Sequence, residues 1–417
     1  MVDLGCGDVS YSGVSLTDKI GLGVLTRLAP RELVAEVIAE TGKREVRKRM
    51  LPARVVVYFV LALALFSRDS YEEVMRKLVQ GLTSIGVWKA DWKVPTTSAL
   101  SQARVRLGVE PLRELFERVA VPCAMRSTAG AWLNGYRLMS LDGFEMEVAD
   151  TEANAAHFGY SGVKGGQKGS FPKIGVLALA ECGTHAIVAA EPGERSEHAL
   201  ARRLLGFRGA FDADMLVMCD RGLYSYALLT GVVAAGANVC FRVSAVVELP
   251  ILKWLPDGSY LSYVADPDAK RNSDQWKSGQ IEVTDLPGVQ VRVVDYEVPG
   301  RGTSNELFTL VTNILDCQEL TAVDLADAYH QRWEIELAFD EIETHQRGAQ
   351  AILRSKTPDM VQQELYGMLI THYGIRQLMT EAADHTGIDP DRLSFTRSLN
   401  IIRRHTTSQA AFSPSDT

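Results

Sequence analysis

The sequence predicts an α/β protein in which an all-helical N-terminal region precedes a mixed-sheet core with a β-rich insertion. Three observations predict this fold. Residues 17–130 repeat apolar side chains at helical spacing, whereas residues 131–247 alternate short apolar strands with helical patterns. Residues 248–303 hold short alternating runs between glycines and prolines. The chain has 417 residues, which is enough for two or three domains with an ample core.

The N-terminal elements follow from local composition. Residues 1–16 are small, polar and Gly-rich, so we expect a flexible lead. Residues 17–130 are the candidate helical DNA-binding domain. Within them the apolar run Val55–Phe66 is too short to cross a bilayer and predicts a buried helix. The segment Thr96–Arg106 opens with cap residues after a proline and predicts another helix, whose Ser, Gln and Arg side chains could reach bases or phosphates.

The first half of the core, residues 131–247, begins with a period-two pattern. The alternation of Tyr136–Val148 predicts a strand, a turn at Asp142-Gly143 and a second strand. Further strands are predicted at 173–180, 185–190, 215–219 and 238–243, with helices at 194–205 and 224–235.

The second half of the core, residues 304–380, follows the insertion. A strand is predicted at 306–311, and one long helix is predicted at 322–344. Thr357-Pro358 starts another helix that runs to about residue 379, because threonine caps a helix and proline suits its first position. Residues 381–417 form the expected tail, poorly ordered over its last 25 or so residues.

Charge is divided unevenly along the chain. The net charge is −8, but residues 1–130 hold 19 Lys+Arg and 14 Asp+Glu, a net of +5, and the remainder carries −13. Contact with a polyanion is therefore more plausible for the N-terminal region, and cation binding for the rest. The start of the chain lacks a signal-peptide pattern, and the six cysteines form no CxxC pair. These features favour a location in the reducing cytoplasm, and they argue against a zinc site or a set of structural disulfides in this protein.

A basic cluster precedes the apolar run. Clustered lysines and arginines release counterions from DNA, so this cluster is a candidate phosphate-contacting surface. A solvated helix end without contact to DNA is an alternative of equal weight for this cluster. The cluster consists of Lys43, Arg44, Arg47, Lys48, Arg49 and Arg54.

Three acids could form a metal site. Asp142 and Asp220 each follow an apolar strand and precede or nearly precede a glycine. Ligands bind at strand ends of α/β sheets, although each aspartate alone could simply form a turn. Glu336 lies on the long predicted helix, seven residues after Tyr329 and four after Arg332, so the three share one helical stripe.

The chemistry of phosphodiester cleavage explains why three carboxylates would be needed at such a site. Two divalent ions about 3.5–4 Å apart can activate an attacking oxygen and stabilise a leaving oxygen. Hard ions such as Mg²⁺ take carboxylate ligands and keep several waters. The eight histidines show no metal-ligand spacing, and no Ser-His-Asp or Cys-His set competes convincingly.

At these residues the chain resembles the DDE transposases of the insertion-sequence-four type, the group with a YREK signature. The resemblance covers about residues 17–380. The matching segments are Leu141-Asp142-Gly143, Asp220-Arg221-Gly222-Leu223-Tyr224, the Tyr329/Arg332/Glu336 signature, Asp150-Thr151-Glu152-Ala153-Asn154 and Leu353-Arg354-Ser355-Lys356.

The resemblance implies a ribonuclease-H-like core in which Asp142, Asp220 and Glu336 bind Mg²⁺ or Mn²⁺. It implies that Tyr329 and Arg332 hold phosphates of the transposon end and that the N-terminal region recognises terminal inverted repeats. The implied activity is cut-and-paste transposition of an insertion sequence. The implied partners are double-stranded DNA, both transposon ends and target, and a second subunit in a synaptic dimer. No membrane partner is expected, and the location would be the bacterial cytoplasm, on the nucleoid when DNA is bound.

One position departs from the family pattern. The final lysine of the signature should follow Glu336 by seven residues, where this chain has Glu343. Arg347, one turn further, could pair with Glu343 or replace the missing cation, and Lys356 is another substitute. Two alternatives to an active transposase stay open: a catalytically impaired or domesticated DNA-binding relative, and a plain ribonuclease-H-like nuclease.

Two further features could contact DNA. The loop 158–173 carries Lys164 and Lys168 among glycines, so it could clamp DNA or could be an ordinary solvated loop. In relatives a tryptophan of the insertion can stack on a flipped base. Trp254 and Trp276 are the candidates, and a packed tryptophan is the alternative for each.

Overall fold

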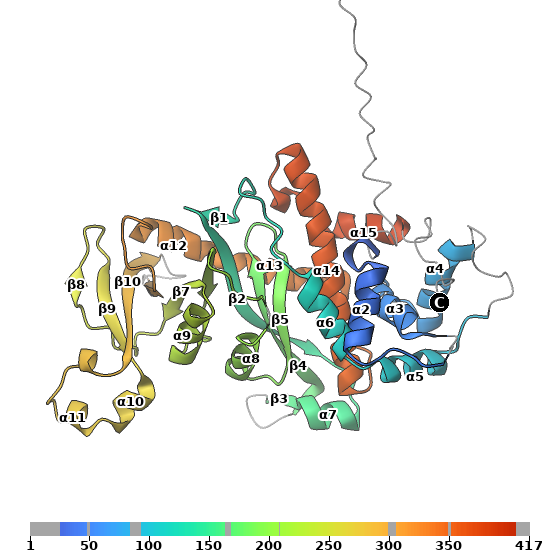
Figure 1. Ribbon diagram of the computed structural model, residues 1–417, viewed down its shortest axis with the longest axis horizontal. Helices are drawn as coiled ribbons and strands as arrows, with labels where there is room; N and C mark the ends of the chain where they lie inside the picture. Colours follow the sequence, from blue (N-terminus) through green and yellow to red (C-terminus); the bar gives the residue numbers. More distant parts are fainter. Residues whose placement is uncertain are drawn as a thin grey trace, which may run out of the picture.

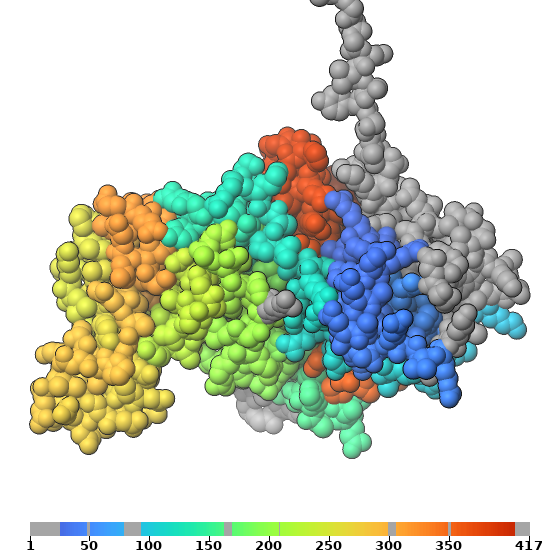
Figure 2. Space-filling view, in the orientation of Figure 1, coloured from blue at the N-terminus to red at the C-terminus, as the bar shows by residue number. Residues whose placement is uncertain are grey.

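The computed structural model describes residues 26–47, 51–83, 93–162, 168–207, 209–298, 306–348 and 352–405. The N-terminal helices lie at one end of the molecule, the sheet crosses its middle, and the insertion projects at the opposite end (Figure 1, Figure 2). The predictions for 1–16, Lys48, Arg49 and Lys164 fall outside the described residues. None of the described helices is both long and apolar enough to cross a membrane.

The N-terminal region is helical in its described part, as the sequence predicts. The apolar run forms α3, which is buried along nearly its whole length. The Thr96 side chain accepts a hydrogen bond from the Ala99 N–H and so caps α5, the predicted second helix. The helices are α2 (Arg31–Glu40), α3 (Ala53–Leu65), α4 (Tyr71–Thr83), α5 (Thr97–Leu107) and α6 (Glu110–Val119).

The expectation that the arginines of α5 face DNA is wrong for Arg104. This side chain is 0% exposed, donates to Gln363, Ser355 and the Met360 carbonyl, and stacks over the ring of Tyr71. A buried guanidinium needs such partners, and here it ties the N-terminal region to α14 (Pro358–Thr386). Arg106, two residues further, is exposed.

The core sheet has the strand order and directions of a ribonuclease-H-like fold. β2, β4 and β5 form an antiparallel meander, and β6 and β7 continue from β2 as parallel strands joined by helices. The α/β fold class and its ribonuclease-H-like core are thus confirmed. The elements are β1 (Trp132–Leu133), β2 (Tyr136–Glu147), α7 (Glu152–Phe158), β3 (Tyr160–Gly162), β4 (Lys168–Glu181), β5 (Ile187–Gly193), α8 (Glu197–Leu204), β6 (Met215–Cys219), α9 (Tyr226–Ala234) and β7 (Asn238–Val243).

The predicted turn at Asp142-Gly143 is wrong. β2 runs through both residues, with Asp142 opposite Ala178 and Gly143 opposite Leu177 in β4. The glycine is needed for a different reason, because a Cβ at position 143 would lie 2.7 Å from Glu197 Oε1. The Glu197 side chain, which reaches Gly143 from α8, therefore occupies the space that a larger residue would need at this position.

The predicted loop at 158–173 is also shorter than expected. β3 and β4 form an antiparallel pair, and Lys168 already belongs to β4. Residues 163–167, which hold Lys164, lie outside the described part.

The insertion is β-rich, and its strands extend the core sheet. β11 pairs with β7 on one side and with β10 on the other, and β9 and β8 follow. Two short helices that the sequence reading did not predict, α10 and α11, interrupt the strands. The elements are β8 (Lys253–Trp254), β9 (Tyr260–Ala265), α10 (Pro267–Asn272), α11 (Asp274–Lys277), a 3-10 turn at Val283–Asp285, β10 (Gly288–Val298) and β11 (Glu306–Thr312).

The predicted single helix at 322–344 is divided. α12 (Ala322–His330) is followed by a 3-10 turn at Gln331–Trp333, α13 (Glu334–Asp340) and a π-helical segment at Glu341–Gln346. A 3-10 turn advances each residue by a larger angle than an α-helix does, so Tyr329, Arg332 and Glu336 are offset from the spacing of one regular helix.

The C-terminal region is more ordered than predicted. α14 runs to Thr386, past the expected end near 379, and α15 (Phe395–His405) follows. Phe395, Leu399 and Ile402, spaced at i, i+4 and i+7, are buried against the rest of the molecule. The expectation of a poorly ordered stretch is therefore wrong for α15, which packs against α14 and the segment Glu341–Gln346.

Candidate active site

Parallel pairing brings Asp142 and Asp220 together. Leu141 of β2 lies opposite Cys219 of β6, so the next residue on each strand is an aspartate. β6 ends at Cys219, and β2 continues past Asp142 beside β4 alone. The two carboxylates thus occupy neighbouring positions at the point where the parallel pairing stops, a location where α/β sheets bind ligands.

The carboxylate of Asp142 has one partner on each oxygen. Oδ1 accepts a hydrogen bond from the Gly143 N–H at 2.8 Å, and Oδ2 accepts one from Arg332 Nη1 at 2.7 Å. Burial raises the pKa of Asp142, the Gly143 N–H and Arg332 lower it, and the charges of Asp220 and Glu336 raise it further. The charges of the other two acids of the predicted triad therefore both reach Asp142.

Asp220 serves its local turn with one oxygen. Oδ1 accepts hydrogen bonds from the N–H groups of Gly222 and Leu223, each at 2.9 Å. Within the described residues Oδ2 accepts no hydrogen bond. The turn-forming role and a role in ligand binding use different oxygens, so the two interpretations of this aspartate are compatible.

The segment from Tyr329 to Glu336 approaches the same site. Tyr329 is 2% exposed, and its hydroxyl donates to the carbonyl of Cys219 at 3.4 Å. Ser140 Oγ donates to the Arg332 carbonyl at 3.0 Å, and Arg332 is itself 6% exposed. Glu336 is exposed. The signature tyrosine and arginine thus bind the backbone and side chain of the two aspartate-bearing strands, and a direct contact of Tyr329 with DNA stays a prediction.

Glu197 is a fourth acid at this site that the sequence reading missed. It begins α8, where Ser196 caps the helix, and its carboxylate lies against Gly143. Burial raises the pKa of Glu197, and the charges of Asp142 and Asp220 raise it further. A glutamate in the first turn of a capped helix is an ordinary sequence feature, so only the contact of its side chain with Gly143 of β2 distinguishes it.

The donor chemistry of the site fits a divalent cation. Hard cations prefer carboxylate oxygen, and these carboxylates repel one another with Arg332 as the balancing cation at Asp142. The ligand oxygens of Asp142, Asp220 and Glu336 do not all lie within 4.8 Å of one another, since the group of described residues that meets this limit is His185, Glu334 and Asp391.

His185, Glu334 and Asp391 form a group of possible metal ligands outside the predicted triad. Arg376 can only donate, and it donates to His185 Nδ1, so a neutral His185 ring carries its proton on Nε2. Nε2 lies 3.1 Å from Asp391 Oδ1 and 3.9 Å from Glu334 Oε2. Tertiary packing, not local spacing, brings this histidine to two carboxylates.

The other predicted DNA-contacting cations differ in their partners and exposure. Arg347 donates from Nε to the backbone carbonyl of Glu343 at 3.3 Å, and both side chains are partly buried. Burial raises the pKa of Glu343, which Arg347 counteracts. Lys43 pairs with Glu110 at 3.6 Å, whereas Arg44 and Arg47 are exposed.

The two candidate tryptophans of the insertion differ in exposure. Trp254 is 61% exposed on β8, edge-on to Tyr260 at 5.2 Å. Trp276 is partly covered by Lys270, whose ammonium lies 4.4 Å from the ring centre. Trp254 is thus the more accessible stacking surface. Trp333 of the signature segment is also exposed, beside Arg332, and the sequence reading gave it no role.

Comparisons with known proteins agree with this site. A family model described as "Insertion element 4 transposase N-terminal" matches residues 19–117, and one described as "Transposase DDE domain" matches residues 133–373. The chain is 29% identical over 381 residues to the transposase InsG for insertion sequence element IS4 of Escherichia coli K12, covering 89% of this chain and 80% of that protein.

A solved structure is also similar. A cryo-EM structure of the piggyBac transposase synaptic complex with hairpin DNA aligns with a TM-score of 0.45 and 12% identity, over 92% of this chain and 80% of that one. The DDE-domain model alone covers more than half of the chain and includes all three acids of the triad. The chain therefore belongs to the DDE transposase family, in its IS4 branch.

Proposed function

We propose that this protein cuts and joins DNA at the terminal inverted repeats of an insertion sequence, by a cut-and-paste reaction that depends on divalent metal ions. One observation carries the proposal. Asp142 and Asp220 lie side by side on parallel strands with Glu336 in electrostatic reach, in a chain of the DDE transposase family. The DNA partner and the use of a divalent metal follow from the family, and the synaptic dimer stays a prediction.

Asp142, Asp220 and Glu336 would hold Mg²⁺ or Mn²⁺. Such ions, when bound, activate an attacking oxygen and stabilise a leaving oxygen. Arg332 favours the ionised form of Asp142 and orients its carboxylate through the 2.7 Å contact. Tyr329, by binding the carbonyl that precedes Asp220, orients the second aspartate. Both signature residues therefore act in the proposed mechanism by positioning the acids.

Glu197 would add a fourth carboxylate to the proposed metal site. Its carboxylate lies against Gly143, next to Asp142, and burial together with the charges of both aspartates raises its pKa. A carboxylate in this position adds negative charge where a divalent ion would bind, and this charge would strengthen the binding of the ion. We include it in the proposed metal-binding set as a fourth acid.

The test uses duplexes that carry the inverted repeats found on either side of the gene. With Mg²⁺ or Mn²⁺, wild-type protein is expected to nick the element end, and Asp142→Asn is expected to lose nicking by several orders of magnitude. Asp214→Asn is the matched control, because Asp214 precedes the start of the same strand β6 and lies away from the acids. Equal nicking by Asp142→Asn and wild type would show that the triad assignment is wrong.

Two further outcomes separate the alternatives. A protein that binds the ends but never cuts them is a DNA-binding relative without catalysis. A protein that cuts but does not join the ends to a supercoiled target is a plain nuclease. Joined products that depend on Asp142, Asp220 and Glu336 support transposition.

A further inference from the structure

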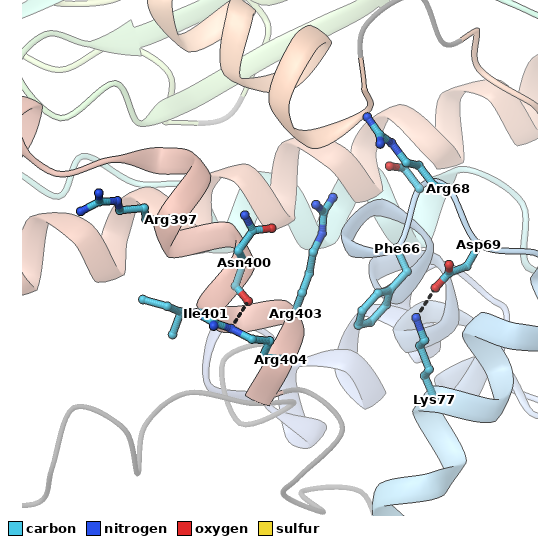
Figure 3. Close-up of a pocket in the computed structure, with 10 residues that line it drawn as sticks. Phe66, Arg68, Asp69, Lys77, Arg397, Asn400, Ile401, Arg403 and Arg404 are labelled. Atoms are coloured by element: carbon cyan, nitrogen blue, oxygen red, sulfur yellow. Dashed lines mark hydrogen bonds and ion pairs between the residues drawn. The ribbon is translucent and has the colours of Figure 1, made fainter.

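A basic pocket lies between the N-terminal helices and the C-terminal helix α15. Its volume is about 750 Å³. Figure 3 shows side chains of α15 on one side and the segment after α3, with Lys77 of α4, on the other. The lining residues are Phe66, Ser67, Arg68, Asp69, Lys77, Arg397, Asn400, Ile401, Arg403 and Arg404.

The pocket is strongly cationic. Five of its side chains are lysine or arginine and one is an acid, Asp69, which already pairs with Lys77. For Arg68, Arg397 and Arg403 no ion pair with an acid occurs within the described residues. The pKa of Arg403 is lowered by burial and by the neighbouring charge of Arg68. Like charges held together in this way favour an anionic ligand between them.

Hydrogen bonds and close packing fix the two walls of the pocket. Arg403 Nε donates to the Leu65 carbonyl at 2.6 Å and Nη2 to the Gln346 carbonyl at 3.2 Å, so α15 is fixed against the end of α3. Gly348, at a φ of 103°, leaves the space that the Arg68 guanidinium uses, since a Cβ there would lie 3.1 Å from Nη2. Two segments far apart in sequence thus hold their arginines toward one cavity.

The pocket is also connected to the active site. Ser67 Oγ donates to the carbonyls of Gln346 and Arg347 at 2.8 and 3.1 Å, where the segment that carries Glu336 ends. Ten residues separate Glu336 from Gln346, roughly 15 Å at the rise of an α-helix. That length corresponds to about four or five nucleotide steps of B-DNA at 3.4 Å each. One duplex could therefore contact both the acids and this pocket.

We propose that this pocket binds backbone phosphates of the DNA that is being cut, a few nucleotides from the scissile bond. The proposal rests on the proposed function and adds a DNA contact from α15, which lies beyond both family-model matches. Arg68 and Arg397 supply exposed charges to phosphate, while Arg403 holds the two walls together. The recognition is of backbone charge and not of base sequence.

The test compares Arg68→Gln/Arg397→Gln with a matched control, Arg76→Gln/Arg271→Gln. The control removes the same charge from exposed arginines, one of them on α4 near Lys77 but outside the pocket lining. Binding of an element-end duplex is measured by fluorescence anisotropy without metal, at several salt concentrations. The pocket variant is expected to bind the duplex roughly tenfold more weakly than wild type. A plot of log K against log[salt] should also be less steep by about 2, because each lost phosphate contact reduces the magnitude of this slope by about 0.9.

Phosphate-ethylation interference then locates the contact. In wild type, ethylation of phosphates on one side of the cleavage point should reduce binding, and in the pocket variant the same ethylation should have little further effect. Melting curves of both double variants should match wild type, since the replaced side chains are exposed.

Three results would overturn the proposal in distinguishable ways. If the pocket variant binds like the control while wild type still cuts element ends, the pocket is not a DNA site and the proposed function stands. If wild type neither binds nor cuts end duplexes, the proposed function fails and the pocket proposal fails with it. If an oligoglutamate peptide binds through the pocket arginines while DNA binding is unchanged by their removal, the partner is an acidic protein segment.

Discussion

Arg332 Nη1 lies 2.7 Å from Asp142 Oδ2, so the signature arginine is an intramolecular partner of the first acid of the proposed triad in this structure. Both side chains are largely buried, at 7% and 23% exposure. The ion pair lowers the pKa of Asp142, whereas burial raises it. The arginine thereby links the signature segment to β2.

Arg332→Gln should reduce end cleavage more strongly at low pH than at high pH. Without the guanidinium the pKa of Asp142 rises further, so a larger fraction of the carboxyl is protonated at a given pH. The acidic limb of the pH–rate profile is therefore expected to move to higher pH. Arg332→Lys should restore most of the shift, because a cation remains. An unchanged acidic limb in Arg332→Gln would show that the pair does not set the ionisation of Asp142.

Glu197→Gln should stabilise the metal-free protein at pH 7 and weaken its response to metal. One of the repelling carboxylates is removed, and with it part of the negative field at the proposed site. Melting temperature is measured with and without Mn²⁺. The variant should melt at a higher temperature without the ion and show a smaller shift with it.

Glu194→Gln is the control for that measurement, because Glu194 is exposed, precedes α8 and pairs with Arg203. If Glu197→Gln and Glu194→Gln respond to Mn²⁺ alike, Glu197 does not belong to the metal-binding set.

Gly143→Ala should destabilise the protein because its Cβ would crowd the Glu197 carboxylate, at 2.7 Å from Oε1 and 3.2 Å from Cγ. Combining it with Glu197→Ala should recover much of the loss, and chemical denaturation of the two single variants and the double variant measures the coupling. Coupling of about 1 kcal/mol or more is expected for residues in contact. Additive effects would mean that the glycine is required for another reason.

Glu334→Gln should change how stability depends on pH. Burial raises the pKa of Glu334 to about 6, opposed by the Gly183 N–H and by His185. The folded state therefore holds this proton more tightly than the unfolded state, and wild-type stability falls as pH rises from the ordinary glutamate range through 6. The variant lacks this loss, so relative to wild type it should gain up to about 2 kcal/mol between pH 4 and 8. Parallel curves from urea unfolding would contradict this.

Arg376→Met should be strongly destabilising. Arg376 is buried and donates to both oxygens of Glu341, which also lies 2.9 Å from His372 Nε2. Removing one partner leaves a buried carboxylate without its cation, at a cost of about 3–5 kcal/mol. A loss below 1 kcal/mol would show that His372 alone satisfies Glu341. Because Glu341 begins the π segment after α13, cleavage activity should fall with stability.

The strands β6 and β7 were predictable to the residue, because each is a short apolar run bounded by polar or turn-forming residues. The buried helix α3 and the capped start of α5 were also predictable from the sequence. The turn at Asp142-Gly143 was not, since Asp-Gly is typical of turns and the reason for this glycine is the Glu197 side chain 54 positions away in sequence. Local patterns also could not reveal α15, whose burial depends on surfaces far earlier in the chain.

The sequence by itself determined the family, the ordered acids Asp142, Asp220 and Glu336, and the order of the core strands, because these depend on local residue pattern and spacing. Only the tertiary structure decided what surrounds them. Parallel pairing of β2 with β6 makes neighbours of two aspartates, α8 adds Glu197, and Arg332 turns inward to Asp142. It also joined Arg68 to Arg403 in one pocket. Burial and charge are properties of residues in contact, and contacts between distant segments are absent from any local pattern.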